Sequence, residues 1–449
     1  MTNLVHELKN GSLQTESDIL MEHQWLPFTP NRDFKKDPRI FSAARGVYYY
    51  SEDGKEIFDG SSGLFTTPAG HARIEIADAV HDQIMELDFT SSFYRSHKKS
   101  FLVADRLAAL LPDKLNKLFF TNSGSESVDT AIKISLAYHR ARGDGSRTIL
   151  VSRERSYHGV NLGGVALSGL VNNRRTFGVS AVPVVHMRHT WLESNKFTPG
   201  QPTHGAELAE DLLRLIELHG AENIAACFVE PIAGSTGALI PPVGYLERLR
   251  EICTAHKILL VFDEVICGFG RTGQPFATQS FGVSPDMITM AKAITNGNIP
   301  MGAVAIHQDI HDTIMNASPE HNIEFFHGYT WSGNPVACAA SLATLDIYQA
   351  ENLFERAASL SQYFLEKVFS LADVTGVLDI RGYGMLAGVD IDPNIIGMNG
   401  YELQKNLFDR GLHLKTTGNS ALLSPPFVSS RENLDFMVDT LRDTLTHRR

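Results

Sequence analysis

The chain has 449 residues, 43 % hydrophobic and 20 % charged, with a formal net charge of −11. This is the usage of ordinary globular proteins and excludes disordered and fibrous classes, and the length allows more than one domain. The acidic balance argues against nucleic acid as a main partner, because phosphate contacts need a basic face. A membrane span is also not expected, since no apolar stretch reaches about 18 residues.

The N-terminal twenty residues, MTNLVHELKNGSLQTESDIL, lack a basic region followed by an apolar one, so we expect no signal peptide. The four cysteines, Cys227, Cys253, Cys267 and Cys338, have neither CxxC spacing nor a zinc-like cluster with histidine. We therefore expect buried thiols, no metal site and a cytoplasmic protein.

Between about residues 100 and 310, helical periods alternate with short apolar runs. Helices are predicted at residues 100–111, 126–140, 208–219 and 245–256. Strands are predicted at residues 115–121, 148–152, 224–230, 258–263, 287–291 and 302–306. Strands that alternate with helices form parallel βαβ units, and long apolar runs such as ILLVF suit strands buried on both faces. The sequence therefore predicts an α/β fold with a mostly parallel sheet between helices.

A second, smaller α/β domain is expected after residue 330. Two long helices at 335–348 and 352–371 precede a mixed section at 377–390 and 412–423. Near the N-terminus, YYYSEDGKEIFDG (48–60) predicts two strands around a turn. We assign residues 61–330 to a large domain and 331–449 to a small one, and we expect residues 1–60 to join the small domain, although sequence alone leaves their side open.

The segment TNSGSES (121–127) follows an apolar strand and opens an amphipathic helix. Ser123 and Glu126 have the spacing of a capping box. Gly124 permits close approach of a ligand, and the free N–H groups of a helix start attract anions. An ordinary capped helix is the alternative, but the clustered Ser123, Gly124 and Ser125 favour a phosphate cradle. The segment is not a P-loop, because the Gly-Lys-Thr/Ser ending is absent.

Polar residues also follow two predicted strands, in VFDEV (261–265) and SYHGV (156–160). Open α/β sheets bind ligands at the carboxyl ends of their strands. Asp263 could therefore pair with a cationic ligand group, coordinate a metal or act as a base, and Tyr157 could stack on a planar ring. The alternatives are a carboxylate that caps the next turn and a surface tyrosine.

A single basic residue, Lys292, lies in the apolar run DMITMAKAITNG (286–297). Taken alone, it could lay its stem on the run and reach solvent, or it could be a desolvated nucleophile. Further on, Thr330 in FFHGYTWSGNP (325–335) could offer a hydroxyl to an anion or lie in a simple connector. Together the sites call for a ligand with a phosphate, a planar ring, a protonated ring nitrogen and an aldehyde. Pyridoxal 5′-phosphate (PLP) has all four.

The order of these motifs resembles the class III PLP-dependent aminotransferases of fold type I, from about Gln24 to the C-terminus. A narrower similarity is to the ω-amino acid:pyruvate group, which includes β-alanine:pyruvate and amine:pyruvate transaminases. The segments that carry this similarity are WLPFTPNR (25–32), FDGSSGLFTTPAGH (58–71), DEVICGFGRTG (263–273) and NGNIPMGAV (296–304).

The resemblance implies a role for each matching residue. Lys292 would form the Schiff base and move the proton, and Asp263 would pair with the pyridine nitrogen. Glu230 would lie near the ring oxygen, and Thr330 would reach the phosphate of the partner subunit in a homodimer. The full set expected to bind the cofactor is Ser123, Gly124, Ser125, Tyr157, His158, Glu230, Asp263, Val265, Lys292 and Thr330.

The substrate pocket is expected to include Trp25, Leu64, Phe65 and Lys415. Related enzymes hold the substrate carboxylate with an arginine, but this chain has Gly411-Leu412-His413-Leu414-Lys415 at the matching place. Lysine keeps the charge and loses the planar fork that grips a carboxylate through two hydrogen bonds. Phe65 also departs, since many relatives have tryptophan there. Both departures leave the substrates open.

We therefore expect a PLP-dependent ω-transaminase that moves an amino group from an ω-amino acid or amine to pyruvate, giving alanine and an aldehyde or ketone. It would act as a homodimer that could pair into a homotetramer. The alternatives are a taurine, diamine or ornithine transaminase, an aminomutase on the same fold, and a catalytically silent PLP-binding protein.

Overall fold

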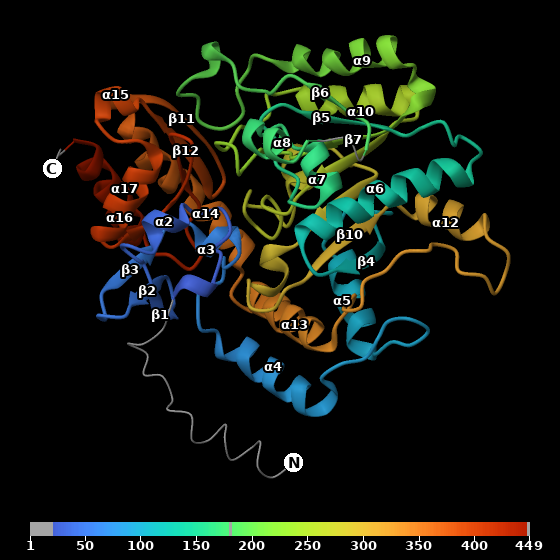
Figure 1. Ribbon diagram of the computed structural model, residues 1–449, viewed down its shortest axis with the longest axis horizontal. Coiled ribbons are helices and arrows are strands. Elements are labelled where there is room, and N and C mark those ends of the chain that lie inside the picture. Colours follow the sequence, from blue (N-terminus) through green and yellow to red (C-terminus); the bar gives the residue numbers. More distant parts are fainter. Residues whose placement is uncertain (1–20, 179–181, 447–449) are drawn as a thin grey trace.

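The computed structural model describes residues 21–178 and 182–446 (Figure 1). The segment for which the signal-peptide prediction was made lies outside these residues. Within them, no helix is long and apolar enough to cross a membrane. The four cysteines are buried and free, as expected.

A seven-stranded sheet forms the centre of the molecule, in the order β4-β10-β9-β8-β7-β5-β6. Its strands are β4 (Lys117–Thr121), β5 (Ile149–Arg153), β6 (Val184–Met187), β7 (Ile224–Val229), β8 (Leu259–Asp263), β9 (Met287–Met290) and β10 (Gly302–Ile306). Only β10 runs against its neighbours in this sheet. The predicted α/β fold with a mostly parallel sheet is confirmed.

Helices follow and precede these strands along the chain (Figure 1). Those of the first part are α2 (Asn31–Phe34), α3 (Ser62–Phe65), α4 (Ile74–Leu87), α5 (Lys98–Ala108), α6 (Gly124–Ala141), α7 (Leu162–Leu167), α8 (Val171–Phe177), α9 (Asp211–His219) and α10 (Tyr245–His256). Those of the second are α11 (Ala277–Phe281), α12 (Gln308–Asn316), α13 (Pro335–Ala350), α14 (Leu353–Phe369), α15 (Pro393–Ile396), α16 (Gly400–Asp409) and α17 (Arg431–Thr446). The helix predicted at 208–219 is divided, because residues Ala206–Glu210 form a 3₁₀ turn before α9.

The central sheet is buried on both faces, which explains its unbroken apolar strands. Successive side chains of a strand point to opposite faces. In β8, Val261 packs in one apolar cluster with Ala131 of α6, whereas Phe262 packs in the other cluster with Leu249 of α10. The layer order is therefore helix, sheet, helix.

Two smaller four-stranded sheets lie apart from the central sheet. One has the order β1-β2-β3-β13, and the other β11-β12-β15-β14. Their strands are β1 (Phe41–Arg45), β2 (Tyr48–Ser51), β3 (Glu56–Asp59), β11 (Val377–Tyr383), β12 (Leu386–Ile391), β13 (Leu412–His413), β14 (Lys415–Thr417) and β15 (Ser420–Leu423).

The N-terminal strands lie beside the C-terminal part of the chain. The two strands predicted in residues 48–60 form an antiparallel pair, β2 with β3. In turn, β3 pairs in parallel with β13, where Phe58 faces Leu412. Figure 1 shows β1–β3 next to α16 and α17. The domain boundaries at residues 61 and 331 stay a prediction.

Candidate active site

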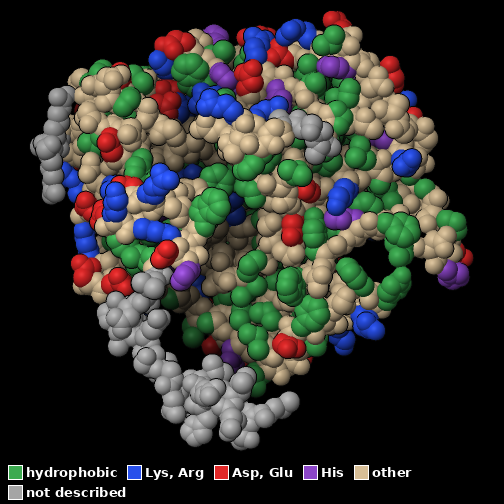
Figure 2. Space-filling model, viewed as in Figure 1, with side chains coloured by type: hydrophobic (Ala, Val, Ile, Leu, Met, Phe, Trp, Pro, Cys, Tyr) green, Lys and Arg blue, Asp and Glu red, His purple; other side chains and the backbone are tan. Residues whose placement is uncertain are grey.

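A cavity of about 330 Å³ opens where the parallel strands of the central sheet end. Figure 2 shows this face of the molecule hollowed near its centre. The lining comes from segments that follow β4, β5, β7, β8 and β9, together with Thr66 directly after α3. The volume lies within the range of about 300–1,000 Å³ for small-molecule sites. The position is the one expected for ligands of open α/β sheets.

The turn after β4 offers a site for an anion. Ser123 caps α6, since its Oγ accepts a hydrogen bond from the Glu126 N–H at 3.2 Å. The Glu126 carboxylate reaches back to the Asn122 N–H at 2.7 Å, one residue before the place a capping box would give. The N–H groups of Gly124 and Ser125 belong to the first helical turn, where no intrahelical acceptor exists. They can receive a phosphate oxygen at the positive end of the helix dipole.

Two glycines allow the walls of the cavity to meet. A Cβ on Gly124 would lie 2.9 Å from Cγ1 of Val265. A Cβ on Gly159, whose φ is +95°, would lie 2.5 Å from Oγ of Ser125. That same Oγ accepts the Val160 N–H at 3.0 Å. The loop after β5 is thereby held against the start of α6.

Asp263 ends β8 with its carboxylate at the cavity wall. Its Oδ2 lies 2.8 Å from Nδ1 of His158, and its Oδ1 accepts the Val265 N–H at 3.2 Å. Both side chains are buried, and within the described residues Nε2 of His158 has no hydrogen-bond partner. A buried carboxylate with these partners is held in one orientation and can bind a cationic ring nitrogen.

Glu230 is a second buried acid of the cavity. One of its carboxyl oxygens accepts the Tyr157 N–H at 3.1 Å. Burial raises the pKa of Glu230 to about 7, and the nearby Asp263 adds to the rise. Burial and these two carboxyl groups also raise the pKa of Tyr157. Glu230 can therefore carry a proton near neutral pH, whereas an exposed glutamate would be ionised.

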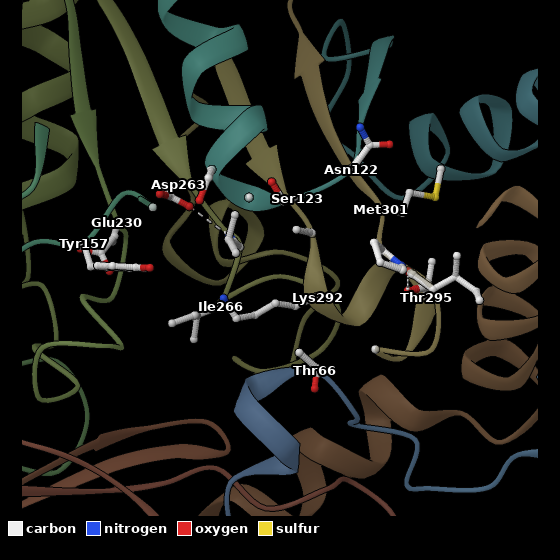
Figure 3. A pocket seen from close by; sticks show the side chains of 18 residues that line it. Thr66, Asn122, Ser123, Tyr157, Glu230, Asp263, Ile266, Lys292, Thr295 and Met301 are labelled. Carbon is white, nitrogen blue, oxygen red and sulfur yellow. Dashed lines mark hydrogen bonds between the residues drawn. The ribbon is translucent and has the colours of Figure 1, made fainter. Parts of the chain in front are cut away.

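Lys292 begins the 3₁₀ turn Lys292–Thr295 (η6) directly after β9. Figure 3 shows its side chain extended across the cavity toward the side where Asp263 and Tyr157 lie. Burial lowers the pKa of Lys292 and the charge of Lys415 lowers it further, while Asp263 opposes both. The neutral amine, which is the nucleophilic form, is therefore more accessible than in an exposed lysine.

The backbone at Lys292 is strained, with φ at +51°. An L-residue in the left-handed region costs about 1–2 kcal/mol, and such strain gathers at functional sites. Asn296, also left-handed, stabilises the turn: its side chain accepts the Ala69 N–H at 3.0 Å and donates to the Gly70 carbonyl at 2.8 Å.

The family model described as Aminotransferase class-III matches residues 31–445. The chain belongs to the class-III aminotransferases. Its relatives include an omega-aminotransferase of Caulobacter vibrioides, 50 % identical over 94 % of this chain and 96 % of the relative. A beta-alanine–pyruvate aminotransferase of Pseudomonas aeruginosa is 45 % identical over 97 % of this chain and 98 % of the relative.

Solved structures agree with this class-III aminotransferase in fold. An omega transaminase from Pseudomonas jessenii in complex with PMP superposes with a TM-score of 0.89 at 30 % identity, covering 94 % of this chain and 96 % of that one. An amine transaminase from an uncultivated Pseudomonas species in its PLP-bound form gives 0.87 at 32 % identity, covering 94 % and 98 %.

The cofactor of this aminotransferase is PLP, and the cavity fits it. The helix-start N–H groups suit its phosphate, the buried carboxylate of Asp263 suits its ring nitrogen, and the amine of Lys292 suits its aldehyde. Gly124 and Gly159 leave no room for a side chain, because a Cβ at either position would meet Val265 or Ser125.

The cavity brings together most of the site residues that the sequence predicted. The predicted residues that line the cavity are Ser123, Gly124, Ser125, Tyr157, Glu230, Asp263, Val265 and Lys292. His158 lies behind this wall and reaches it through Asp263. Glu264, the other acid of the DEV motif, is turned away and accepts the N–H groups of Ala277 at 2.5 Å and Thr278 at 2.9 Å, so it caps α11.

Besides His158, five predicted residues are not part of the cavity lining. Trp25 is 90 % and Leu64 51 % exposed, whereas Phe65 is buried in the core. Lys415 is half-buried near Lys292, and burial lowers its pKa. Thr330 is exposed. Their assignment to the substrate pocket, or to the partner's phosphate, stays a prediction.

Sequence reasoning did not select ten residues that line the cavity. They are Thr66, Asn122, Gly159, Ile266, Ala291, Thr295, Gly297, Ile299, Pro300 and Met301. The loop at 297–301 could have been found from its Gly and Pro content directly after Lys292. Thr66 could not, since Gly297 meets it across more than two hundred residues of sequence, where a Cβ would lie 2.9 Å from the Thr66 Cβ.

Proposed function

We propose that this class-III aminotransferase transfers an amino group from an ω-amino acid or a primary amine to pyruvate, giving alanine and an aldehyde or ketone. One observation carries the chemistry: the buried amine of Lys292 faces a cavity shared with Asp263 and the anion-binding turn of α6. Support for the substrates comes from the relatives named for omega-amino acids, β-alanine and pyruvate.

Each residue has a separate role in this proposal. Gly124 and Ser125 would bind the phosphate, Asp263 would keep the ring nitrogen protonated, and Tyr157 and Val265 would contact the two faces of the ring. When bound, PLP supplies an aldehyde that accepts the amino group and a ring that withdraws electrons from the substrate carbon.

Lys292 moves the proton in both halves of the reaction. Its neutral amine would take the proton from the amine-bearing carbon of the donor, and the resulting ammonium would return that proton to the carbon that the aldehyde of PLP supplies. The second half runs in reverse with pyruvate. The apolar wall formed by Ile266, Ile299 and Met301 limits water near this amine, which keeps the neutral form accessible.

We also propose a homodimer. Thr330 is exposed, and it is not among the residues that line this subunit's cavity. Large apolar side chains are also exposed on this subunit, among them Met85 at 76 %, Tyr94 at 90 % and Trp331, the residue after Thr330, at 59 %. Association of two copies would bury such side chains, and Thr330 of each subunit would complete the phosphate site of the other.

The test is a donor panel with pyruvate: β-alanine, taurine, putrescine, 1-phenylethylamine and ornithine. We expect alanine from β-alanine or 1-phenylethylamine. Preference for taurine, putrescine or ornithine would indicate the corresponding transaminase. No alanine with any donor would contradict the proposal and favour an aminomutase or a silent protein.

A lysine comparison tests the chemistry. After borohydride reduction, peptide mass analysis should place the cofactor on Lys292, and Lys292→Ala should abolish both the adduct and alanine formation. Lys36→Ala, which removes an exposed lysine, is the matched control and should change neither. An adduct on another lysine in the unsubstituted protein would refute the assignment.

A further inference from the structure

The segment 325–334, which carries Thr330, is fixed to the helix that opens the phosphate site. Nε2 of His327 lies 2.9 Å from the Thr130 hydroxyl of α6, and the Tyr329 hydroxyl lies 3.3 Å from the same atom. The Tyr329 hydroxyl also donates to the Glu126 carbonyl at 3.3 Å. Glu126 belongs to the first turn of α6, next to Ser125.

Lys133, at one end of this series of hydrogen bonds, determines their direction. Nζ of Lys133 lies 3.3 Å from Nδ1 of His327, and an ammonium can only donate. Nδ1 therefore accepts, and Nε2 carries the hydrogen that it donates to Thr130. The Thr130 hydroxyl then donates to Tyr329, and Tyr329 donates to the Glu126 carbonyl.

The imidazole of His327 is held in place and kept neutral. Its ring stacks on Phe119 of β4, with centroids 5.4 Å apart and planes 8° from parallel. Burial and, to a smaller extent, the charge of Lys133 lower the pKa of His327 to about 4. Thr130, which receives its hydrogen, is fully buried. An imidazole with one defined tautomer makes a rigid link.

The rest of the segment is anchored on the far side of Thr330. The Gly333 carbonyl lies 2.7 Å from Nε2 of His97, and the Tyr329 N–H donates to the Ser332 hydroxyl at 3.2 Å. Both ends of the turn are therefore held, and the exposed Thr330 lies between them.

We propose that His327 is a positioning residue for cofactor binding, which fixes Thr330 relative to the phosphate-binding turn of α6. The chain His327–Thr130–Tyr329–Glu126 then joins a subunit's own phosphate site to the contact that it makes with its partner's phosphate. This inference rests on the proposed homodimer and on the proposed contact of Thr330. It adds a function for residues that lie outside the cavity.

The test compares two cofactors that differ in the phosphate alone. The dissociation constants of PLP and of pyridoxal are measured by absorption titration of the apoprotein of the full chain. We expect His327→Ala and Thr330→Val each to weaken PLP about tenfold, the size of one hydrogen bond to a charged group, and to leave pyridoxal unchanged. The double variant should be no weaker than either single one, because both remove the same contact.

Two further variants separate positioning from a general effect on folding. His327→Gln keeps an N–H donor toward Thr130 and should restore PLP affinity to within about threefold of the unsubstituted protein. His204→Ala, which removes an exposed histidine elsewhere, should have no effect.

The failures are distinguishable. If Thr330→Val leaves PLP affinity unchanged, the proposed contact with the partner's phosphate is wrong and the inference falls with it. If Thr330→Val weakens PLP but His327→Ala adds a full further tenfold loss, the contact stands and the positioning role of His327 is wrong. Equal weakening of pyridoxal by His327→Ala also overturns that role.

Discussion

Gly124→Ala tests how closely the cavity walls must approach. The added Cβ would lie 2.9 Å from Cγ1 of Val265, which is closer than real Cβ contacts, and 3.0 Å from its Cγ2, which is tighter than most of them. Overpacking of this kind costs about 1–3 kcal/mol, whereas Ala in place of Gly within a helix returns about 1 kcal/mol. The free energy of unfolding should therefore fall by no more than about 2 kcal/mol.

Cofactor affinity should fall more clearly than stability. The clash is relieved if the first turn of α6 moves away from Val265, and this displaces the N–H groups offered to the phosphate. Since 1.4 kcal/mol is a factor of ten in an equilibrium constant, a loss of about 1–3 kcal/mol predicts a dissociation constant of PLP about five to 150 times higher. Absorption titration of the apoprotein measures it, and the melting temperature of the same sample reports stability.

The matched control is Val265→Ala, alone and in combination. Removing both Cγ atoms gives the new methyl group room, so Gly124→Ala in a Val265→Ala background should have almost no further effect on PLP binding. A coupling energy near zero, with each substitution weakening PLP independently, would refute the argument from close approach.

Three other predictions follow from the buried acids and from Lys415. Burial raises the pKa of Glu264 to about 8 from an ordinary 4.5. Its contribution to stability is therefore complete below about pH 4.5 and is lost as the pH rises through about 8. Glu264→Gln should make the melting temperature depend less on pH between pH 5 and 8, and an unchanged slope would contradict this. Glu230, with its pKa raised to about 7, should produce a step near that pH in kcat/KM, which Glu230→Gln removes unless another group titrates there. Lys415→Ala should raise KM for β-alanine more than for 1-phenylethylamine, and Lys415→Arg should lower it, because the fork of arginine binds a carboxylate bidentately; equal effects on both donors would exclude Lys415 as the carboxylate contact.

The sequence was sufficient for the chemistry where local patterns decide position. Asp263 ends an apolar strand and Lys292 follows another. The carboxyl ends of buried parallel strands lie at the ligand-binding edge of the sheet, so both residues are expected there. The local pattern alone does not show which of the adjacent acids, Asp263 or Glu264, faces the cavity. Strand alternation requires Asp263 and Glu264 to point to opposite sides, but which side holds the cavity depends on how α11 folds back to accept its cap.

Other parts of the site depend on contacts that no local pattern contains. The reversed direction of β10 is not encoded in its apolar run GAVAI, which would equally suit a parallel strand. The exposure of Trp25 and Leu64 likewise depends on what covers them rather than on their residue type. The sequence pattern does not predict the short strand β6, because four residues are too few to distinguish strand periodicity from a loop.

The reversal of β10 has a consequence for how this enzyme could diversify. Because β10 returns toward β9, the connection between them stays at one end of the sheet, and residues 297–301 cover the cavity directly after Lys292. Gly302 then lies under the start of α6, where a Cβ would come within 2.6 Å of the Thr121 hydroxyl. The residues between these two fixed points can vary without disturbing a strand. A mutant library confined to Ile299, Pro300 and Met301 would therefore reshape the pocket while leaving Lys292, the sheet and the phosphate site in place.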